Sequence, residues 1–267
     1  MEPQPIYSSP SRRMRLGIFM SGSGSNAIRM LEKSREPDSN YDVVLIFSDV
    51  KDTRTRGGRK MCRAKDIAEE WGVAYESLDI RDFYSERGLK RSDLSVRPEF
   101  DRLVLDLVRP YQLDLIANAG YMSIMSTPLL EEFDGRIVNV HPADLRLVEG
   151  GRRKYVGIHV VRDAILAGEK ELRSTTHIVR EEVDHGEILV VSEPVEVRLE
   201  HGLEELLRDR ELLESVVSSH QQRLKEKGDW VIYPLTIQFI SQGRFALLDG
   251  VVYLDGEPLP EGLVLGG

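Results

Sequence analysis

The chain has 267 residues, of which 41% are hydrophobic and 30% charged, a balance typical of a globular protein with a sizeable core. This composition excludes collagen-like and wholly disordered chains, and no apolar run reaches the roughly 18 residues that a membrane span requires. With 36 basic against 45 acidic residues, the net charge of −9 does not favour nucleic acid as a partner.

The single cysteine, Cys62, cannot form an internal disulfide and cannot by itself supply a thiolate zinc site. No apolar segment of a secretory signal follows the N-terminus. We therefore expect a cytoplasmic protein, monomeric or homodimeric, that acts on a small molecule. No metal and no nucleic-acid or membrane partner is expected.

Residues 1–13 are rich in Pro and Ser and lack hydrophobic periodicity, which predicts a flexible tail. From residue 14 onward, apolar runs alternate with amphipathic stretches. Strands are predicted at 16–19, 41–48, 73–75, 113–117 and 137–140, with helical spacing near 61–68 and 103–108. Pro110 ends the second helix. This alternation predicts an α/β fold with a mostly parallel sheet covered by helices on both faces.

The second half of the chain has a different pattern. Strands are predicted at 174–179 and 188–197 without a full helix between them, so they should join the sheet in a mixed or antiparallel arrangement. Apolar residues over 203–217 have the spacing of a long amphipathic helix, and Asp249-Gly250 predicts a C-terminal hairpin. Because no linker intervenes, we expect one domain over 14–267, with halves of 14–140 and 141–267.

A glycine-rich loop, Ser21–Asn26, lies between the first predicted strand and a helix. Backbone N–H groups at a helix start bind anions, and glycine lets the backbone approach a phosphate closely. Gly22, Gly24 and Ala27 also fit G-x-G-x-x-[GA], and Asp49 ends the second strand, as a ribose-binding acid does in dehydrogenases. The loop therefore predicts a phosphate site for a mononucleotide or a dinucleotide.

A polar cluster follows the predicted strand at 137–140. Asn139 and His141 are two residues apart in an extended segment and should share one face. An amide beside an imidazole suits a reaction that forms an oxyanion, because both groups stabilise it and the imidazole moves protons. Asp184, seven residues after His177, joins them only if the fold brings it there; the alternative is a structural histidine at a strand end. No G-x-S-x-G sequence supports a Ser-His-Asp hydrolase.

Taken in order, these motifs resemble the folate-dependent glycinamide ribonucleotide formyltransferases of purine synthesis. The resemblance runs from Leu16 to about Gly262 through SGSGSN, AGYMSIMS (119–126), NVHP (139–142), STTHIV to VDHG (174–186), IYPL (232–235) and YLDGEPLPEG. It implies a Rossmann-like N-terminal half and a folate cleft between the halves. The implied reaction moves the formyl group of 10-formyltetrahydrofolate to the amine of glycinamide ribonucleotide or a closely related phosphorylated amine.

The resemblance also implies residue roles. Asn139 and protonated His141 would stabilise the oxyanion, while Asp184 would orient His141 and relay protons. The acceptor would contact the phosphate loop, the residue after the histidine and an acid at the ribose: Gly22, Gly24, Ser25, Asn26, Pro142 and Asp229. The folate would contact one loop and the backbone near the aspartate: Gly120, Tyr121, Met122, Ser123, Ile124, Met125, Val138, Glu181, Glu182 and Val183.

Three departures from the family pattern bear on the acceptor. Ser123 stands where the folate loop usually has Arg, and His-Gly-Glu follows Asp184 in place of Gly-Gly-Pro. An insert at 145–157 lengthens the segment after the histidine, as loops readily tolerate. It contains four basic residues and is expected to be either a solvated loop or a mobile basic lid over the anionic acceptor: Arg146, Arg152, Arg153 and Lys154.

Three alternatives stay open. A 10-formyltetrahydrofolate hydrolase shares the Asn-His-Asp set but carries an N-terminal regulatory domain, for which 13 residues are too few. A methionyl-tRNA formyltransferase carries a basic C-terminal domain that this sequence does not show. A non-catalytic nucleotide- or NAD-binding Rossmann protein would use the glycine loop and Asp49, but would leave NVHP and the C-terminal motifs unexplained.

Overall fold

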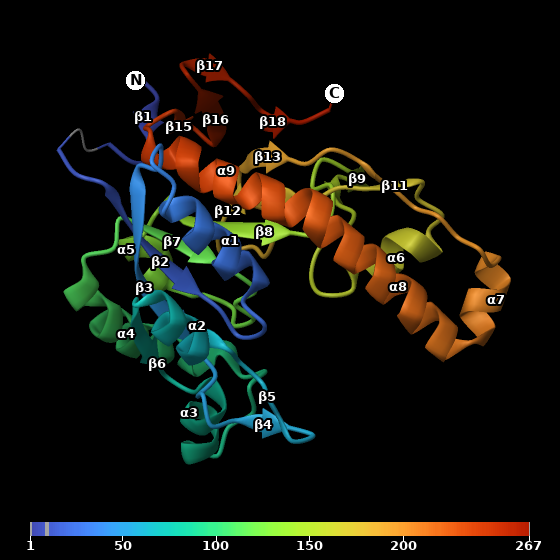
Figure 1. Ribbon diagram of the computed structural model, residues 1–267, viewed down its shortest axis with the longest axis horizontal. Helices are drawn as coiled ribbons and strands as arrows, with labels where there is room; N and C mark the ends of the chain where they lie inside the picture. The colour runs from blue at the N-terminus through green and yellow to red at the C-terminus, as the bar shows by residue number, and fades with distance from the viewer. Residues whose placement is uncertain (1, 9–10, 267) are drawn as a thin grey trace.

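The computed structural model describes residues 2–8 and 11–266 and is built around an eight-stranded sheet of order β18-β13-β12-β8-β7-β2-β3-β6 (Figure 1). Five neighbouring strands are parallel: β6 (Ala74–Ser77), β3 (Tyr41–Ser48), β2 (Met14–Phe19), β7 (Leu115–Asn118) and β8 (Ile137–His141). Three further strands make the sheet mixed. β12 (Thr175–Ile178) is antiparallel to β8 on one side and to β13 (Ile188–Val191) on the other, and β18 (Leu263–Val264) is parallel to β13. The predicted α/β fold, mostly parallel with mixed strands in its second half, is confirmed.

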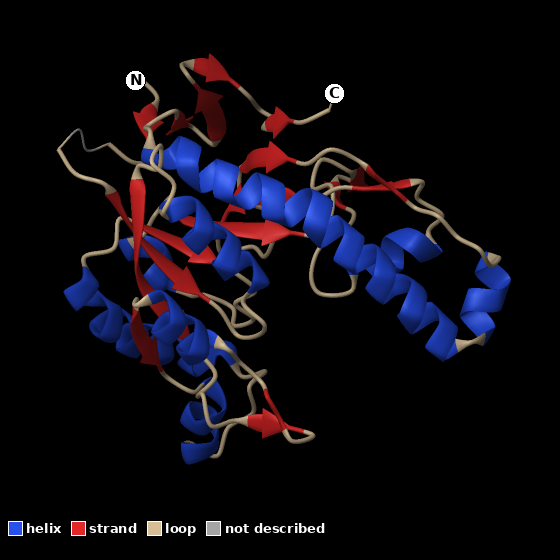
Figure 2. Cartoon of the chain, viewed as in Figure 1, coloured by secondary structure: helices blue, strands red, loops and turns tan. Residues whose placement is uncertain are grey.

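Helices cover both faces of this sheet, which is why the central parallel strands, such as β7 and β8, are mostly apolar (Figure 2). The core on one face includes three helices: α1 (Ser25–Ser34), α2 (Ala64–Trp71) and α9 (Trp230–Ser241). Three others pack on the opposite face: α3 (Ile80–Glu86), α4 (Arg97–Val108) and α5 (Thr127–Glu132). The sheet is therefore buried on both sides, and its strand ends are what a ligand can reach.

The helix predicted over 203–217 is in fact two helices, and the second extends well beyond. α7 (Leu203–Arg208) ends at Asp209, whose side chain caps α8 (Arg210–Leu224) by accepting from the Leu212 N–H at 3.0 Å. α8 continues through a π-helical turn, η3 (Lys225–Asp229), directly into α9, as Figure 1 shows. The apolar period continues across Asp209, so the sequence pattern did not reveal this break.

The N-terminal segment is packed at residues 4–7, unlike the flexible tail that its composition predicts. β1 (Gln4–Pro5) pairs with β15 (Phe245–Leu248), and Ile6 and Tyr7 are buried. Two adjacent apolar residues are too few for a periodic pattern, so this contact was invisible in the sequence. Residues 9 and 10 of the predicted tail lie outside the described residues.

The predicted C-terminal hairpin is confirmed. β15 pairs with β16 (Val251–Leu254) across Asp249-Gly250, which adopt the left-handed conformation of a two-residue hairpin turn, with φ of 49° and 76°. β17 (Glu257–Pro258) pairs with β16 and completes a separate four-stranded sheet. The hairpin therefore lies outside the central sheet.

Other predicted boundaries are corrected by tertiary pairing. The strand predicted at 188–197 stops at Val191, and β14 (Val195–Glu196) pairs instead with β11 (Glu171–Leu172). Met61 precedes α2 and is not helical. Smaller elements complete the chain: β4 (Thr55–Arg56), β5 (Arg59–Lys60), η1 (Leu94–Val96), η2 (Arg109–Tyr111), β9 (Val148–Glu149), β10 (Arg152–Arg153) and α6 (Val160–Leu166).

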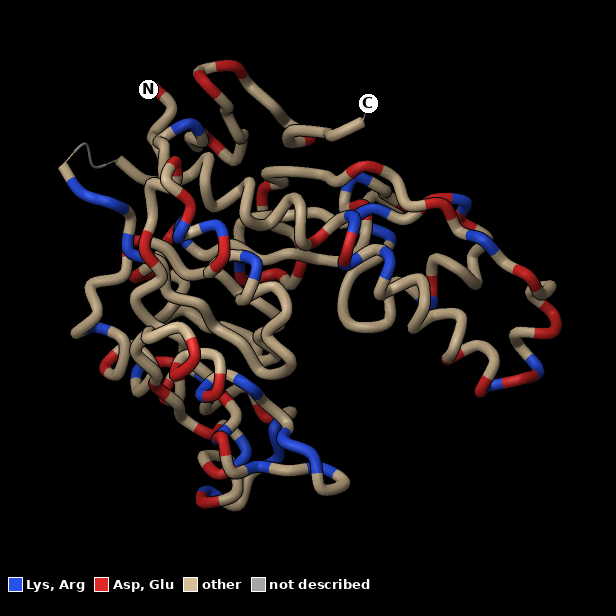
Figure 3. The backbone as a smooth tube through the Cα atoms, viewed as in Figure 1, with Lys and Arg blue, Asp and Glu red and all other residues tan. Residues whose placement is uncertain are grey.

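Acidic and basic residues are interspersed along the backbone, with a basic group around the β4–β5 hairpin (Figure 3). Several of these cations have acidic partners, including Arg54 with the buried Asp79 at 2.8 Å and Lys60 with Asp66 at 2.5 Å. Their charge is therefore partly neutralised within the protein. In the part of the chain that the structure describes, no helix is both long and apolar enough to cross a membrane.

Candidate active site

The strand order reverses between β2 and β7. After β2, the chain adds β3 and β6 on one side of it and then returns to add β7 and β8 on the other side. In open α/β sheets, ligands bind beyond the carboxyl ends of the strands at such a reversal. The glycine loop 21–26 follows β2, and the loop 119–126 follows β7. The Ser21 N–H donates to the Gly120 carbonyl at 3.1 Å, which joins the two loops. The topology thus places both predicted ligand loops at one position.

A cleft of about 670 Å³ opens at this position. Its lining comes from both halves of the chain and contains residues 21–26, 118–125, 139–142, 157, 158, 177, 179–181, 183, 184, 221, 225 and 229. All predicted site residues except two are in this set. Val138 is fully buried, and its carbonyl accepts from the Tyr233 hydroxyl at 2.9 Å. Glu182 is exposed and lies 3.6 Å from His185.

The glycine loop ends at Gly24, which is the N-cap of α1 and has a left-handed backbone with φ of 73°. A Cβ atom here would lie 2.3 Å from Ile67 Cδ1 and 2.7 Å from Met20 Cε. The left-handed backbone conformation favours glycine here, and a larger residue would also have to displace the ends of the Ile67 and Met20 side chains. No side chain caps α1, so its first N–H groups remain available to an anion.

Asp49 does not have the ribose-binding position that the sequence allowed. Its side chain is buried, with one carboxylate oxygen accepting from the Ser21 hydroxyl at 2.5 Å and the other from the Ser123 hydroxyl. Burial raises the pKa of Asp49, and these two hydrogen bonds oppose that shift. Asp49 therefore fastens the glycine loop to the 119–126 loop, and Ser123 has a local partner in place of a ligand. The dinucleotide interpretation loses the acid on which it depended.

Antiparallel pairing of β8 with β12 assembles the polar cluster, because it places Asn139 opposite His177. The Asn139 amide Nδ2 lies 3.2 Å from His177 Nε2, and His177 Nδ1 donates to the Ile178 carbonyl at 2.8 Å. Asp184 Oδ2 lies 3.5 Å from His141 Nδ1, and Asp184 Oδ1 lies 3.5 Å from His177 Nε2. The fold therefore brings Asn139, His141 and Asp184, hereafter the Asn-His-Asp cluster, to one end of the cleft.

Burial and neighbouring charges shift the pKa values of His141 and Asp184 in opposite directions. Burial lowers the pKa of His141, although the Asp184 carboxylate raises it. Burial alone would raise the pKa of Asp184, but His177, His141 and the Gly157 N–H at 2.8 Å outweigh it and hold that pKa below its ordinary value. The second ring nitrogen of His141, Nε2, faces the Tyr155 carbonyl at 3.1 Å. Asp184 is therefore an anion beside the His141 ring. Because both nitrogens of that ring face acceptors, the ring can carry two protons, and a negative charge developing nearby would favour this protonated form.

Asp229 ends the π turn η3 and faces the glycine loop. It accepts from Ser174 Oγ at 2.5 Å and from Asn26 Nδ2 at 3.3 Å, and its burial raises its pKa. The preceding residue, Gly228, lets the helix approach β12 closely, because a Cβ there would lie 2.5 Å from Ser174 Oγ. The sequence offered Asp229 as a candidate acid, and this packing turns its carboxylate toward the glycine loop.

Lys225 is a cleft residue that the sequence reasoning missed. It lies one π turn before Asp229, where a π-helical turn departs from the ordinary 3.6-residue period. Arg180, the other basic residue of the lining, pairs with Glu187 at 2.7 Å and with Asp134. Within residues 2–8 and 11–266, Lys225 is therefore the one basic side chain of the cleft lining without an ion pair.

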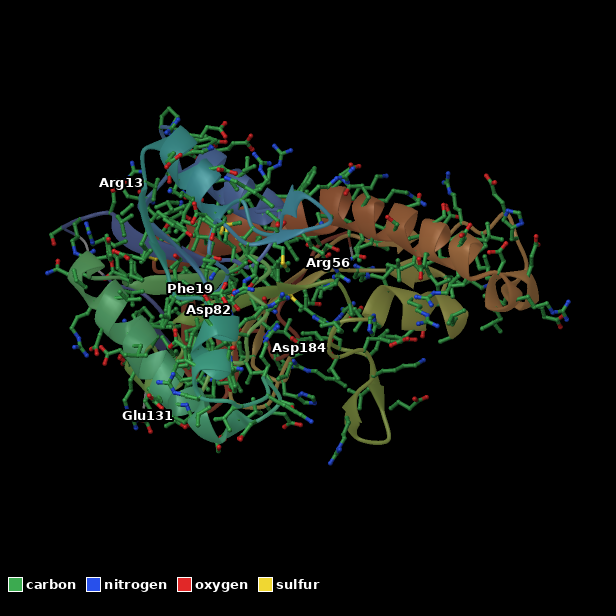
Figure 4. The ribbon with its side chains drawn as sticks, turned by 90° about the horizontal axis from the view of Figure 1, so that it is seen from below. Arg13, Phe19, Arg56, Asp82, Glu131 and Asp184 are labelled. Atoms are coloured by element: carbon green, nitrogen blue, oxygen red, sulfur yellow. The ribbon has the colours of Figure 1, made fainter. Side chains whose placement is uncertain are left out.

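The insert 145–157 is not a free basic lid. Arg146 pairs with Asp144 at 2.7 Å, Lys154 pairs with Glu169 at 2.9 Å, and Arg153 donates to backbone carbonyls near Asp184. Of its four cations, only Arg152 lacks a partner among the described residues. Figure 4 shows Asp184 near the base of the hairpin that β9 and β10 form. A lid that closes on an anion requires unpaired charges, and here most of them are used within the protein.

The fold and the cleft place the chain among Rossmann-like α/β proteins with a ligand site at the strand-order reversal. A family model, Formyl transferase, matches residues 14–216, so the chain belongs to the formyl transferase family. The resemblance read from the motifs, and with it the assignment as a formyltransferase, is confirmed. For the described residues, no group of three or more His, Cys, Asp or Glu side chains is arranged to hold a metal ion.

Similar proteins agree with this family. The chain is 28% identical to the phosphoribosylglycinamide formyltransferase of Haemophilus influenzae, over 92% of this chain and 96% of that protein. The glycinamide ribonucleotide transformylase 1 structure from Symbiobacterium toebii matches with a TM-score of 0.65 and 25% identity, covering 91% of this chain and 95% of that one. A formyltetrahydrofolate deformylase from Pseudomonas putida shares the fold, with a TM-score of 0.64 and 18% identity over 92% of this chain and 72% of that one.

Proposed function

We propose that this chain transfers the formyl group of 10-formyltetrahydrofolate to the primary amine of glycinamide ribonucleotide. The observation that carries the proposal is the meeting, in one cleft, of an anion-binding loop and the Asn-His-Asp cluster. Relatives with this activity by name match nearly their full length. The glycine loop would therefore hold the phosphate of the acceptor, while the Asn-His-Asp cluster acts at the amine of the same molecule.

The acceptor would lie along the glycine loop. Its phosphate would accept from the uncapped N–H groups at the start of α1 and from the ammonium of Lys225. The Asp229 carboxylate, held by Ser174 and Asn26, would accept from ribose hydroxyls. This orientation directs the amine away from the loop and toward the Asn-His-Asp cluster.

The folate would lie against the 119–126 loop. Four apolar side chains of the cleft lining are exposed although they lie in a concavity: Met122 by 57%, Ile124 by 42%, Ile158 by 71% and Val183 by 47%. Exposed apolar side chains in a cleft mark a ligand site, and they suit the faces of a flat ring system. The residues present therefore fit a folate, whose 10-formyl group supplies an activated one-carbon unit.

The cluster would act on the charges of the transfer. As the acceptor amine bonds to the formyl carbon, negative charge develops on the formyl oxygen. The bond between the formyl carbon and the folate nitrogen then breaks, while the acceptor amine loses a proton and the departing folate nitrogen gains one. Asn139 has two amide protons; one faces His177, and the other is free to donate to that oxygen. Protonated His141 would donate from Nε2 to the same oxygen in exchange for the Tyr155 carbonyl, while Asp184 would hold Nδ1 and help relay the amine proton through water.

The test is formyl transfer from 10-formyltetrahydrofolate with and without glycinamide ribonucleotide, followed by mass spectrometry of the product. We expect formylated ribonucleotide and little free formate. The matched comparison is glycinamide riboside, which lacks the phosphate and should show a much higher KM with a similar kcat. Formate release at the same rate with or without the acceptor would instead support a hydrolase.

A further inference from the structure

The end of the insert contacts the Asn-His-Asp cluster at several atoms. Arg153 Nη1 donates to the Asp184 carbonyl at 2.5 Å, and Nη2 donates to the Gly186 carbonyl at 2.9 Å. The Gly157 N–H donates to Asp184 Oδ2 at 2.8 Å, and the Tyr155 carbonyl faces His141 Nε2 at 3.1 Å. A segment that the sequence presents as a surface loop is therefore built into the polar cluster.

The turn that carries Asp184 needs such support. Asp184 has a left-handed backbone, with φ of 57°, a conformation that residues other than glycine adopt at an energetic cost. The residues before it, 181–183, are exposed. Arginine suits the task because its planar guanidinium donates two parallel hydrogen bonds with fixed geometry. The half-buried Arg153 side chain uses that fork on two carbonyls of one turn.

We propose that Arg153 is a positioning residue, whose guanidinium fork holds the 184–186 turn so that the Asp184 carboxylate reaches both His141 and His177. The inference rests on the proposed function, since it assumes that the Asn-His-Asp cluster performs the transfer. In this proposal, the insert is a fixed support for the 184–186 turn and not a mobile basic lid. The positive charge of Arg153 acts on the protein's own backbone, and the acceptor is bound elsewhere in the cleft.

A positioning role and a charge role can be separated by titration. The charged and titratable groups that face His141 are Asp184 from the turn, His177 from β12 and Arg153 from β10. After burial, which is the largest influence, Asp184 raises the pKa of His141, whereas His177 and Arg153 lower it. Removing the Arg153 charge would raise that pKa if Asp184 stayed in place. Releasing the turn would move Asp184 away and lower it.

The experiment compares Arg153→Ala and Arg153→Lys with Arg152→Ala, which removes the neighbouring exposed cation, one without a partner among the residues that the structure describes. We expect kcat to fall about 100-fold in Arg153→Ala, as it does when reacting groups are displaced by about 1 Å, with acceptor KM changed less than threefold. Arg153→Lys keeps the charge but not the fork, so its kcat should fall at least tenfold. Arg152→Ala should keep the wild-type kcat.

The C2–H NMR signal of His141 gives a readout that does not depend on activity. In Arg153→Ala and Arg153→Lys its titration midpoint should fall, because Asp184 moves away. A midpoint that rises in Arg153→Ala, or wild-type kcat in either variant, would overturn the inference. Equal losses in Arg152→Ala and Arg153→Ala would also overturn it, in favour of a charged lid. If Arg153→Ala melts early, Arg153→Lys decides by the same criteria. Activity retained after His141→Ala would instead overturn the proposed function.

Discussion

The glycine loop and the Asn-His-Asp cluster line the same cleft but are built in different ways. The loop presents backbone N–H groups, and its geometry follows from one strand, one turn and one helix that are contiguous in the chain. The cluster presents side chains from β8 and from the turn after β12, supported by the insert. A site made of backbone groups binds through local geometry, whereas a site made of side chains depends on how distant segments meet.

This difference predicts different responses to substitution. Side-chain truncation cannot remove the backbone donors of the loop, so changes around it should alter acceptor binding by modest factors. Truncation in the cluster removes the reacting groups themselves and should alter kcat by large factors. The split between kcat and KM therefore measures how cleanly the two regions divide their work.

The largest effect is expected for His141→Ala and Asp184→Asn. Each should lower kcat by at least about 10³-fold, because proton transfer and oxyanion stabilisation are lost together. Single-turnover formyl transfer measures the loss, with thermal unfolding to show an intact fold. His159→Ala, at an exposed histidine outside this cleft, is the matched control. Turnover above a tenth of the wild-type rate in His141→Ala would break the comparison.

Asn139→Ala should lower kcat by about 10²-fold, the usual cost of removing one oxyanion donor. Acceptor KM should stay within about threefold of wild type, because Asn139 contacts His177 and not the glycine loop. Steady-state kinetics with varied acceptor checks this split. A rise in KM with unchanged kcat would place Asn139 with the binding region.

Lys225→Ala tests the other side of the comparison. Loss of one charge-assisted contact with the phosphate should raise acceptor KM about tenfold and leave kcat within about twofold. The salt dependence of acceptor KM should also become weaker. Lys227→Ala, an exposed lysine in the same π turn and outside the cleft, should behave as wild type. Equal effects of the two substitutions would point to general surface charge.

Asp229→Asn should have the smallest effect on the transfer reaction, with a small change in stability and a moderate rise in acceptor KM. Burial raises the pKa of Asp229 above its ordinary 3.8, so the carboxyl stabilises the fold below that pH and loses this contribution as pH rises through its folded pKa. An amide cannot ionise, so the Tm of the variant relative to wild type should rise by a few degrees as the pH is raised above about 4. Acceptor KM should rise, since an amide accepts ribose hydroxyls less well. A Tm difference independent of pH would contradict the assignment of a buried carboxylate.

The sequence alone determined the parallel strands, the glycine loop, the hairpin at Asp249-Gly250 and the resemblance to the formyltransferases. These features depend on residues close together in the chain, where the spacing of apolar residues, the turn residues and the order of the motifs can be read directly from the sequence. It also brought Asn139 and His141 to one face, because two residues of a single strand two positions apart must project together. The amino-acid types that form the cluster could thus be identified from the sequence alone.

Only the tertiary structure decided which distant groups meet. The β8–β12 register placed His177 against Asn139, and the 184–186 turn brought Asp184 to His141. Asp49 became a tie between two loops, and the π turn brought Lys225 into the cleft lining. The contacts of the insert likewise engaged Arg153, which the sequence assigned either to a solvated loop or to a basic lid, with two backbone carbonyls of the 184–186 turn. These outcomes depend on strand register and on packing between segments far apart in the chain, and no local pattern of residues encodes either one.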